Sequence, residues 1–407
     1  MFAPDVVSTA ALVSRLAREL QALGHSVSVI TTTPHYNVSP AADRGPALRR
    51  RWLGLAYESD YSGIPVFHVR VRRRGNRVLG RILDFLWLHL LTLVRGLADR
   101  RGIDVVYAPS PPLTVGVVAW LIARLRGAAV IYNVQEIYPD IAERLGAVQR
   151  GRALGALHRV ESFIYRRSDR VVVIAPAFAR RIAGRGVPAG RLDVIANFVD
   201  TVQLAPVTRR PNPFSAEHGL DDRFVVLYAG NIGLTQDFET VLAAADLLVD
   251  VPDVVLVIVG GGVRRTWLEG TLAARPRANV LLLPYQPETE LASMYGAADA
   301  GLVPLGSGMG WDTFPSKVYS IMAAARPVVA LADAGTALAD TVHEAGCGVV
   351  VAPGDAAALA SAILALRGDA ARREACGASG RNWVVRHHTP GTAAARYDSV
   401  IRDLAGD

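Results

Sequence analysis

The chain contains a single lysine, Lys317, against 43 arginines among its 407 residues. Pro315 and Ser316 precede it, and Thr313 is a candidate N-cap for a helix that begins there. A helix start presents unpaired N–H groups and the positive end of a dipole, which together favour phosphate. Lysine adds a compact point charge. The pattern predicts a phosphate or diphosphate pocket, and chance survival of one lysine in an arginine-biased composition is the alternative.

Glycine-rich loops follow two candidate strands, residues 224–229 and 254–259, in the same half of the chain. They supply five candidate donor-binding residues: Gly230, Asn231 and Gly233 in the first loop, and Gly260 and Gly261 in the second. A third loop, residues 304–313, contains Asp312 and leads into Lys317. Ligands of open α/β sheets bind beyond the carboxyl ends of the strands. We therefore expect the three loops to meet at a nucleotide diphosphate.

The first half of the chain offers acidic and imidazole groups at its own strand ends. Glu136 and Asp140 follow a candidate strand at 129–133, where a carboxylate could orient or deprotonate an acceptor hydroxyl. Helix capping and salt bridges are the alternative roles for both. His35 follows a candidate strand at 26–31 and is a candidate acceptor contact, although a lone loop histidine is more often structural.

Apolar strands alternate with helical patterns along most of the chain, which predicts an α/β protein of two doubly wound, Rossmann-like domains with parallel sheets. We expect a first domain over residues 1–205 and a second domain, which carries the three loops, over 206–389, with a final helix, 390–405, that packs back on the first domain. The first strand of the first domain is apparently missing, because the chain opens in what resembles the loop after it. We expect the true start to lie upstream.

The net charge of +7 is concentrated at residues 49–51 and in six arginines between residues 70 and 81. The second cluster leads into an apolar helix, residues 78–97, whose segment 85–94 carries Trp87. Basic residues beside such a helix are typical of proteins that lie on anionic membranes. A buried helix with a solvated arginine loop is the alternative. Nucleic acid is not expected, since no recognised nucleic-acid motif accompanies the charge.

Several classes of protein are disfavoured. No apolar run reaches the ~20 residues of a membrane span. The cysteines, Cys347 and Cys376, show no metal or disulfide spacing. No P-loop, HExxH or strand-linked GxGxxG motif occurs. A cytoplasmic protein without a bound metal or cofactor is expected.

The chain resembles the GT-B-fold glycosyltransferases of family four, especially the branch of bacterial L-fucosamine and colanic-acid-type transferases. The motifs that carry the resemblance are Gly24-His25-Ser26-Val27, Ser110-Pro111-Pro112-Leu113, NVQEIYPD at 133–140, YAGNIG at 228–233, IVGGG at 258–262, Phe314-Pro315-Ser316-Lys317 and Ala352-Pro353-Gly354-Asp355. The resemblance implies a nucleotide-sugar donor on the second domain and an acceptor on the first. It further implies retention of anomeric configuration and no need for a metal. Together with the arguments from the residues above, it makes Lys317, Asp312 and Glu136 the candidate catalytic residues.

The chain departs from the family pattern at four donor-site positions. The family's two glutamates, separated by seven residues, are replaced by Asp312 and Ser320, and two of its cations by Asn231 and Gln236. We hypothesise that the protein transfers a sugar to a lipid-linked or other saccharide acceptor on the inner face of the plasma membrane. The expected donor is a UDP-sugar, in preference to a GDP-sugar. A UDP-sugar 2-epimerase and a non-catalytic sugar-nucleotide-binding protein are the alternatives.

Overall fold

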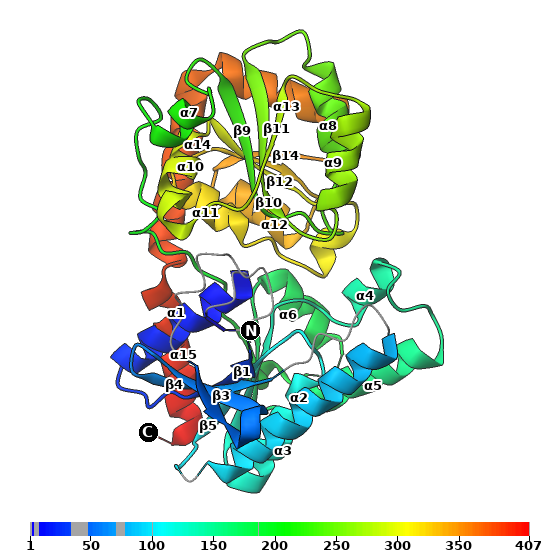
Figure 1. Ribbon diagram of the computed structural model, residues 1–407, viewed down its shortest axis with the longest axis vertical. Coiled ribbons are helices and arrows are strands. Elements are labelled where there is room, and N and C mark those ends of the chain that lie inside the picture. Colours follow the sequence, from blue (N-terminus) through cyan, green and yellow to red (C-terminus); the bar gives the residue numbers. More distant parts are fainter. Residues whose placement is uncertain are drawn as a thin grey trace.

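The computed structural model describes residues 2–3, 8–33, 48–70, 78–99, 101–185 and 187–406. It consists of two α/β domains, stacked along the long axis of the molecule (Figure 1). The first half of the chain builds the lower domain in that view and the second half builds the upper one. The chain returns to the lower domain at its C-terminal end.

The second domain has one six-stranded parallel sheet in the order β11-β10-β9-β12-β13-β14. Its strands are β9 (Phe224–Asn231), β10 (Val254–Gly261), β11 (Val280–Leu283), β12 (Ala300–Pro304), β13 (Val328–Leu331) and β14 (Gly348–Val351). Its helices are α7 (Pro213–Glu217), α8 (Phe238–Leu247), α9 (Arg265–Ala274), α10 (Leu291–Ala297), α11 (Lys317–Ala323), α12 (Ala337–Glu344), α13 (Ala356–Gly368) and α14 (Ala370–His387). Because helices cover both faces, the central strands are buried along almost their whole length. The doubly wound fold predicted for this half is confirmed.

The first domain has two four-stranded sheets, in the orders β1-β4-β3-β2 and β5-β6-β7-β8. Its strands are β1 (Val29–Thr32), β2 (Arg49–Arg51), β3 (Ala56–Tyr61), β4 (Ile64–Val69), β5 (Val105–Pro109), β6 (Ala129–Val134), β7 (Arg170–Val173) and β8 (Leu192–Val194). Its helices are α1 (Ser8–Ala22), α2 (Val78–Ala98), α3 (Val115–Arg126), α4 (Asp140–Arg144), α5 (Arg152–Arg167) and α6 (Pro176–Ala183).

The parallel sheet expected for this domain holds only in part. β2 and β3 were not predicted, and both pair in antiparallel register, β2 with β3 and β3 with β4. Ser62 and Gly63 both have positive φ, 54° and 86°, so the turn between β3 and β4 has the backbone of a tight two-residue hairpin. The local signal for this hairpin is the Ser-Gly turn, which sequence analysis overlooked.

The two sheets of the first domain are separated between β1 and β5. Among the described residues no strand pairs with the outer edge of β1 or with that of β5. In a doubly wound sheet the first strand lies between the second and the fourth.

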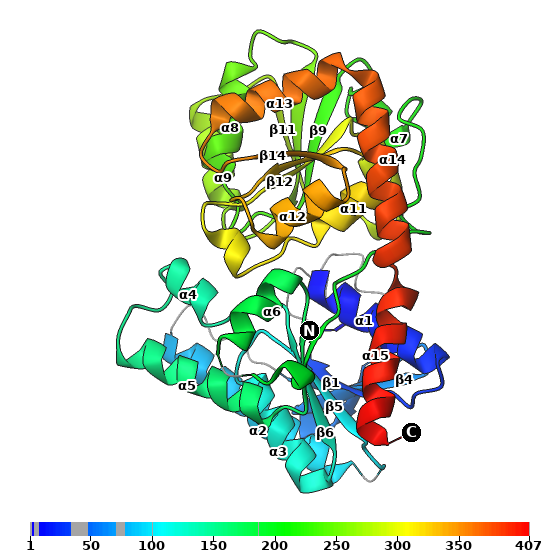
Figure 2. The same cartoon turned by 180° about the vertical axis from the view of Figure 1, so that it is seen from behind.

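The C-terminal segment joins the two domains along one side of the molecule. Figure 2 shows α14 on the second domain and α15 (Pro390–Ala405) on the first, almost end to end. Thr389 caps α15 with a reciprocal pair of bonds to Thr392, and Pro390 occupies its first turn. The buried face of α15, which includes Tyr397, packs with Leu16 of α1 and with the strands beneath.

Candidate active site

Lys317 and Gly230 lie in contact at the carboxyl end of the second domain's sheet. The Lys317 Nζ donates a hydrogen bond of 2.6 Å to the Tyr228 hydroxyl and lies 3.8 Å from the centre of its ring. A Cβ added to Gly230, whose φ is +137°, would lie 3.1 Å from the same Nζ. Glycine at this position therefore makes room for the ammonium group beside the end of β9.

The Lys317 ammonium is a half-buried cation with no acidic partner in the described part of the chain. Burial lowers the pKa of Lys317 to about 7, and no neighbouring carboxylate opposes the shift. A desolvated charge without a counter-ion is costly, and it marks a place where an anion would be stabilised.

The remaining strand-end glycines bring backbone close to backbone. A Cβ on Gly260 would lie 1.9 Å from the carbonyl oxygen of Gly230, so β9 and β10 can approach only if Gly260 has no side chain. The Tyr285 ring packs against Gly261, and the Tyr285 hydroxyl donates to the Gly261 carbonyl at 3.2 Å. Gly233 donates its N–H to the Gln236 side chain at 2.8 Å. Gln236, at the position of a family cation, thus closes the first glycine loop.

The predicted start of the lysine helix is wrong in detail. α11 begins at Lys317, and Ser316 is its N-cap residue, without a side-chain capping bond. Thr313 lies three residues further back and instead directs its hydroxyl to Glu136, at 3.5 Å. The N–H groups of Val318 and Tyr319 donate to the carbonyls of Pro315 and Ser316. These two amides at the start of α11 are therefore already engaged.

Ser320, Asn231 and the two arginines at the start of α9 have their own partners. Ser320 hydrogen-bonds to the Tyr295 hydroxyl, and the Asn231 carbonyl accepts from Tyr228. Arg264 pairs with Glu239, and Arg265 binds the carbonyls of Gly260 and Leu283. Either arginine would have to leave these partners before it could bind an anion together with Lys317.

Glu136 lies where the two domains meet. It pairs as an isolated antiparallel bridge with Thr313, and the adjacent N–H of Ile137 donates to the Asp312 carbonyl at 2.9 Å. Burial raises the pKa of the Glu136 carboxyl, with only the weak Thr313 bond opposing. The structure therefore brings this predicted acceptor-side carboxylate against the loop that leads to Lys317.

Asp312 is fully buried between arginines of the first domain. Its Oδ2 accepts from Arg144 Nε at 2.8 Å, and its Oδ1 lies 3.0 Å from Arg181 Nη2. Burial raises the pKa of the Asp312 carboxyl, while both arginines act in the opposite direction. A carboxylate in this arrangement holds the domains together and faces guanidinium groups rather than open space.

Asp140 belongs to the same network. It pairs with Arg181 at 2.8 Å and with Arg185 at 2.6 Å. Burial alone would raise the pKa of Asp140, but the bonds from Arg185 and Arg181 lower it below its usual value. We call Arg144, Arg181 and Arg185 the junction arginines. Sequence analysis missed all three, because their acidic partners lie on other elements. One of these partners, Asp312, even belongs to the other domain.

A metal site is poorly supported by the acidic groups nearby. Among the described residues, Asp140, His158 and Glu161 lie close enough together to share an ion. However, Arg185 donates to both Asp140 and Glu161, so a guanidinium already occupies the space between the carboxylates. His35, the other predicted acceptor contact, lies outside the described residues.

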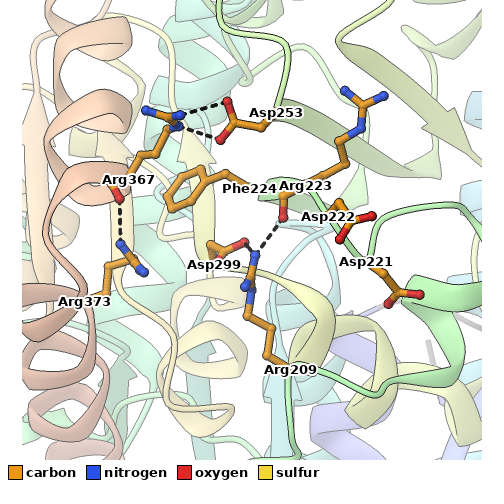
Figure 3. A pocket seen from close by; sticks show the side chains of 9 residues that line it. All are labelled: Arg209, Asp221, Asp222, Arg223, Phe224, Asp253, Asp299, Arg367 and Arg373. Carbon is orange, nitrogen blue, oxygen red and sulfur yellow. Dashed lines mark hydrogen bonds and ion pairs between the residues drawn. The ribbon is translucent and has the colours of Figure 1, made fainter.

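A cavity of the second domain lies at the opposite end of its sheet (Figure 3). It measures about 440 Å³ and borders the amino end of β9, at Phe224. Its charges are mostly paired, Arg367 with Asp253 and Arg209 with Asp299. Because these four charges neutralise one another, this end of the sheet offers less attraction to a nucleotide than the Lys317 end does.

Two family models match the chain and between them cover most of it. The Glycosyl transferase 4-like domain matches residues 9–197, and the Glycosyl transferases group 1 domain matches residues 212–383. The chain belongs to the GT4-like glycosyltransferases. It is therefore an enzyme of this type, as the resemblance predicted.

Relatives and solved structures agree with this assignment. The chain is 25% identical over 374 residues, 89% of each protein, to WcaI of Escherichia coli, named as a colanic acid biosynthesis glycosyl transferase. It is 27% identical over 293 residues to the glycosyltransferase WbjE of Pseudomonas aeruginosa, covering 72% of this chain and 73% of WbjE.

The fold is also that of sucrose-phosphate synthase from Thermosynechococcus elongatus, with a TM-score of 0.76 at 22% identity, covering 99% and 96% of the two chains. HepE of Anabaena, solved with UDP and glucose, has a TM-score of 0.70 to this chain at 14% identity, covering 95% of each chain. Both comparisons place the GT4-like glycosyltransferase in the GT-B fold.

Proposed function

We propose that this GT4-like glycosyltransferase moves a sugar from a nucleotide-diphosphate donor, UDP-sugar in preference to GDP-sugar, to a lipid-linked saccharide during polysaccharide biosynthesis. The acceptor class is supported by the name of the relative WcaI, which refers to colanic acid. The preference for UDP is supported by HepE, a protein of the same fold solved with UDP and glucose.

One observation carries the donor assignment. Lys317 places a half-buried ammonium group, without an acidic partner among the described residues, against Gly230 at the strand ends where α/β sheets bind ligands. The diphosphate of a nucleotide sugar supplies the missing negative charge. As the sugar leaves, negative charge grows on that diphosphate, so the same ammonium would stabilise the transition state more than the ground state.

The acceptor would approach from the first domain. Glu136, which burial makes a stronger base than an exposed glutamate, would orient the acceptor hydroxyl; its bridge to Thr313 of the Lys317 loop supports this role. His35 stays a predicted acceptor contact, and Asp140 acts there only through the junction arginines. We propose a metal-independent reaction, supported by the guanidinium between the nearby carboxylates, and retention of configuration, supported by the family resemblance.

The donor assignment is tested by ligand-dependent thermal stability. UDP should raise the melting temperature of the native protein, since a ligand that binds only the folded state stabilises it by mass action. Replacing Lys317 by Ala should weaken UDP binding about 10- to 100-fold, the range expected for a lost charge-assisted hydrogen bond.

A matched control removes a cation from the far end of the same sheet. Arg367→Gln disrupts an exposed ion pair with Asp253, and it should leave the UDP-induced shift unchanged. Equal UDP shifts in wild type and Lys317→Ala would refute the role of Lys317. Product analysis by NMR with the donor and a saccharide acceptor then tests retention.

A further inference from the structure

The helix α2 presents an apolar face to solvent. The exposed large side chains on it are Phe85, Leu86, Leu90, Val94 and Leu97, with exposed fractions of 38% to 59%. At about 100° per residue, the last four fall within roughly a quarter of the helix circumference. They form a continuous stripe, which we call the α2 stripe (Leu86, Leu90, Val94 and Leu97).

The polar residues of α2 do not interrupt this stripe. Arg95 turns toward the domain, where its guanidinium lies 5.1 Å from the centre of the Phe67 ring and pairs with Asp99. His89 is held by the Thr114 hydroxyl at 2.6 Å. Leu91, about 100° around the helix from the centre of the stripe, is buried against the first sheet. A surface helix normally faces its polar side outward, so an outward apolar stripe indicates a partner.

Described arginines gather at the C-terminal end of the stripe. Arg126 of α3 binds the carbonyls of Gly96 and Leu97, and Arg101 beside it is 46% exposed. At the other end, α2 follows the arginine-rich segment 70–81 in the sequence. Along the sequence, α2 therefore lies between this segment and Arg101.

A third helix extends the positive charge. α2 packs on α3 and α3 packs on α5, so the three lie side by side (Figures 1 and 2). On α5, Arg152, Arg159 and Arg166 are exposed at a spacing of seven residues, which places them on one face. An apolar helix next to a row of guanidinium groups matches the chemistry of an anionic lipid surface.

We propose that α2 lies flat on an anionic membrane, with the α2 stripe among the acyl chains and the flanking arginines on lipid phosphates. The helix has 21 residues and is about 32 Å long. No helix in the described part of the chain is long and apolar enough to span a bilayer. This membrane contact rests on the proposed function, because it would bring the enzyme to a lipid-linked acceptor that lies in the membrane.

A second copy of the chain is a less suitable partner for this face. Two copies related by a twofold axis through α2 would pack the helices antiparallel or parallel, and each arrangement sets basic ends of one copy beside basic ends of the other. The like charges oppose such a dimer, whereas phosphate headgroups neutralise them.

The test is flotation of the full chain with vesicles of phosphatidylcholine alone or mixed with phosphatidylglycerol. The wild type should bind the mixed vesicles and bind the neutral ones at least about tenfold more weakly, because surface charge adds to apolar burial. The double variant Leu86→Glu/Leu90→Glu should lose at least about tenfold in binding to the mixed vesicles. Leu247→Glu on α8, exposed by 58% compared with 59% and 51% for the two stripe leucines, is the matched control and should bind normally.

Circular dichroism and melting temperature verify that the variants fold. Equal vesicle binding by wild type and the double variant would overturn the proposal, and so would absence of wild-type binding. A dimer in sedimentation velocity that the double variant dissociates, without vesicle binding, would assign the stripe to a second copy. The Lys317→Ala variant should still bind vesicles, so failure of the donor assignment and failure of membrane binding are distinguishable.

Discussion

At the scale of single residues, Lys317 is the group with the most unusual environment at the donor end of the second domain. Its ammonium has an aromatic ring and a hydroxyl as neighbours but no carboxylate among the described residues. Arginine is difficult to accommodate there, because its planar guanidinium is larger than an ammonium, and the ammonium already lies within 3.1 Å of where a Cβ on Gly230 would be. This offers a physical reason for one lysine in an arginine-rich chain.

The lowered pKa of Lys317 predicts a pH-dependent donor affinity. With a pKa of about 7, the free enzyme loses this charge progressively above neutral pH. A bound diphosphate favours the charged form and raises the pKa, so binding takes up a proton above pH 7. UDP affinity should therefore fall as pH rises, by up to tenfold per unit, and calorimetry in buffers of different ionisation enthalpy should register the uptake.

The same titration affects stability with a defined sign. The unfolded lysine keeps its proton up to about pH 10.5, so between about 7 and 10.5 the unfolded chain binds more protons and this group makes stability rise with pH. If UDP binding took up no proton at pH 8, the pKa assigned to Lys317 would be contradicted. The same would hold if the UDP affinity of Lys317→Ala depended on pH as that of the wild type does.

At the scale of elements, Arg144 of α4 and Arg181 of α6 join the first domain to the loop before α11. Arg144 and Arg181 bind the two oxygens of Asp312, while the strand-like contact of Glu136 with Thr313 runs alongside. The loop that leads to Lys317 is therefore positioned by the first domain as well as by the second, to which it belongs.

This arrangement predicts coupling between Arg144 and Asp312. Arg144→Gln and Asp312→Asn should each lower kcat/KM, because the first leaves the buried Asp312 carboxylate with Arg181 as its one described counter-charge and the second leaves Arg144 without its carboxylate. The double variant should lose less transition-state stabilisation, calculated from kcat/KM, than the two single variants lose together. The difference, the coupling energy, should be about 0.5–3 kcal/mol. Arg150→Gln, which affects an exposed pair with Glu143, should change little. Strict additivity would show that the pair does not position the loop.

Sequence patterns predict those parts of the site that depend on local geometry. The glycines at 230 and 260 and the lysine at 317 could be found because strand ends, positive φ and helix starts leave residue-level signals. The N-cap assignment to Thr313 failed because a tight turn at Pro315 and Ser316 supplies the bonds instead. Neither the β2–β3 pairing nor the partners of Asp312 could be derived, since both depend on contacts between elements rather than on local pattern.

At the scale of the whole molecule, His388 lies where the chain passes from α14 to α15 and links the domains. Its ring stacks on Tyr319 of α11 at 4.2 Å and on Trp383 of α14 at 4.4 Å. Its Nδ1 lies 2.9 Å from the carbonyl oxygen of Asn197, in the first domain. Tyr319 is two residues from Lys317, so this stack connects α11 to the first domain.

Replacing His388 by Ala should therefore loosen the two domains from each other. We expect the melting transition in calorimetry to broaden or divide into two, because each domain then unfolds more independently. His387→Ala, an exposed neighbour, is the control and should keep the wild-type transition. An unchanged transition in His388→Ala would rule out the linking role.

The buried imidazole of His388 also gives the junction between the domains a sensitivity to acid. Burial lowers the pKa of His388 to about 4, from 6.5. The unfolded chain therefore takes up a proton there as pH falls from about 6.5 to 4, and the native protein loses stability across that window. His388→Phe, which keeps an aromatic ring, should remove this part of the acid sensitivity. Melting temperatures measured from pH 7 to 4 check this, and parallel profiles for wild type and His388→Phe would assign the acid sensitivity to other groups.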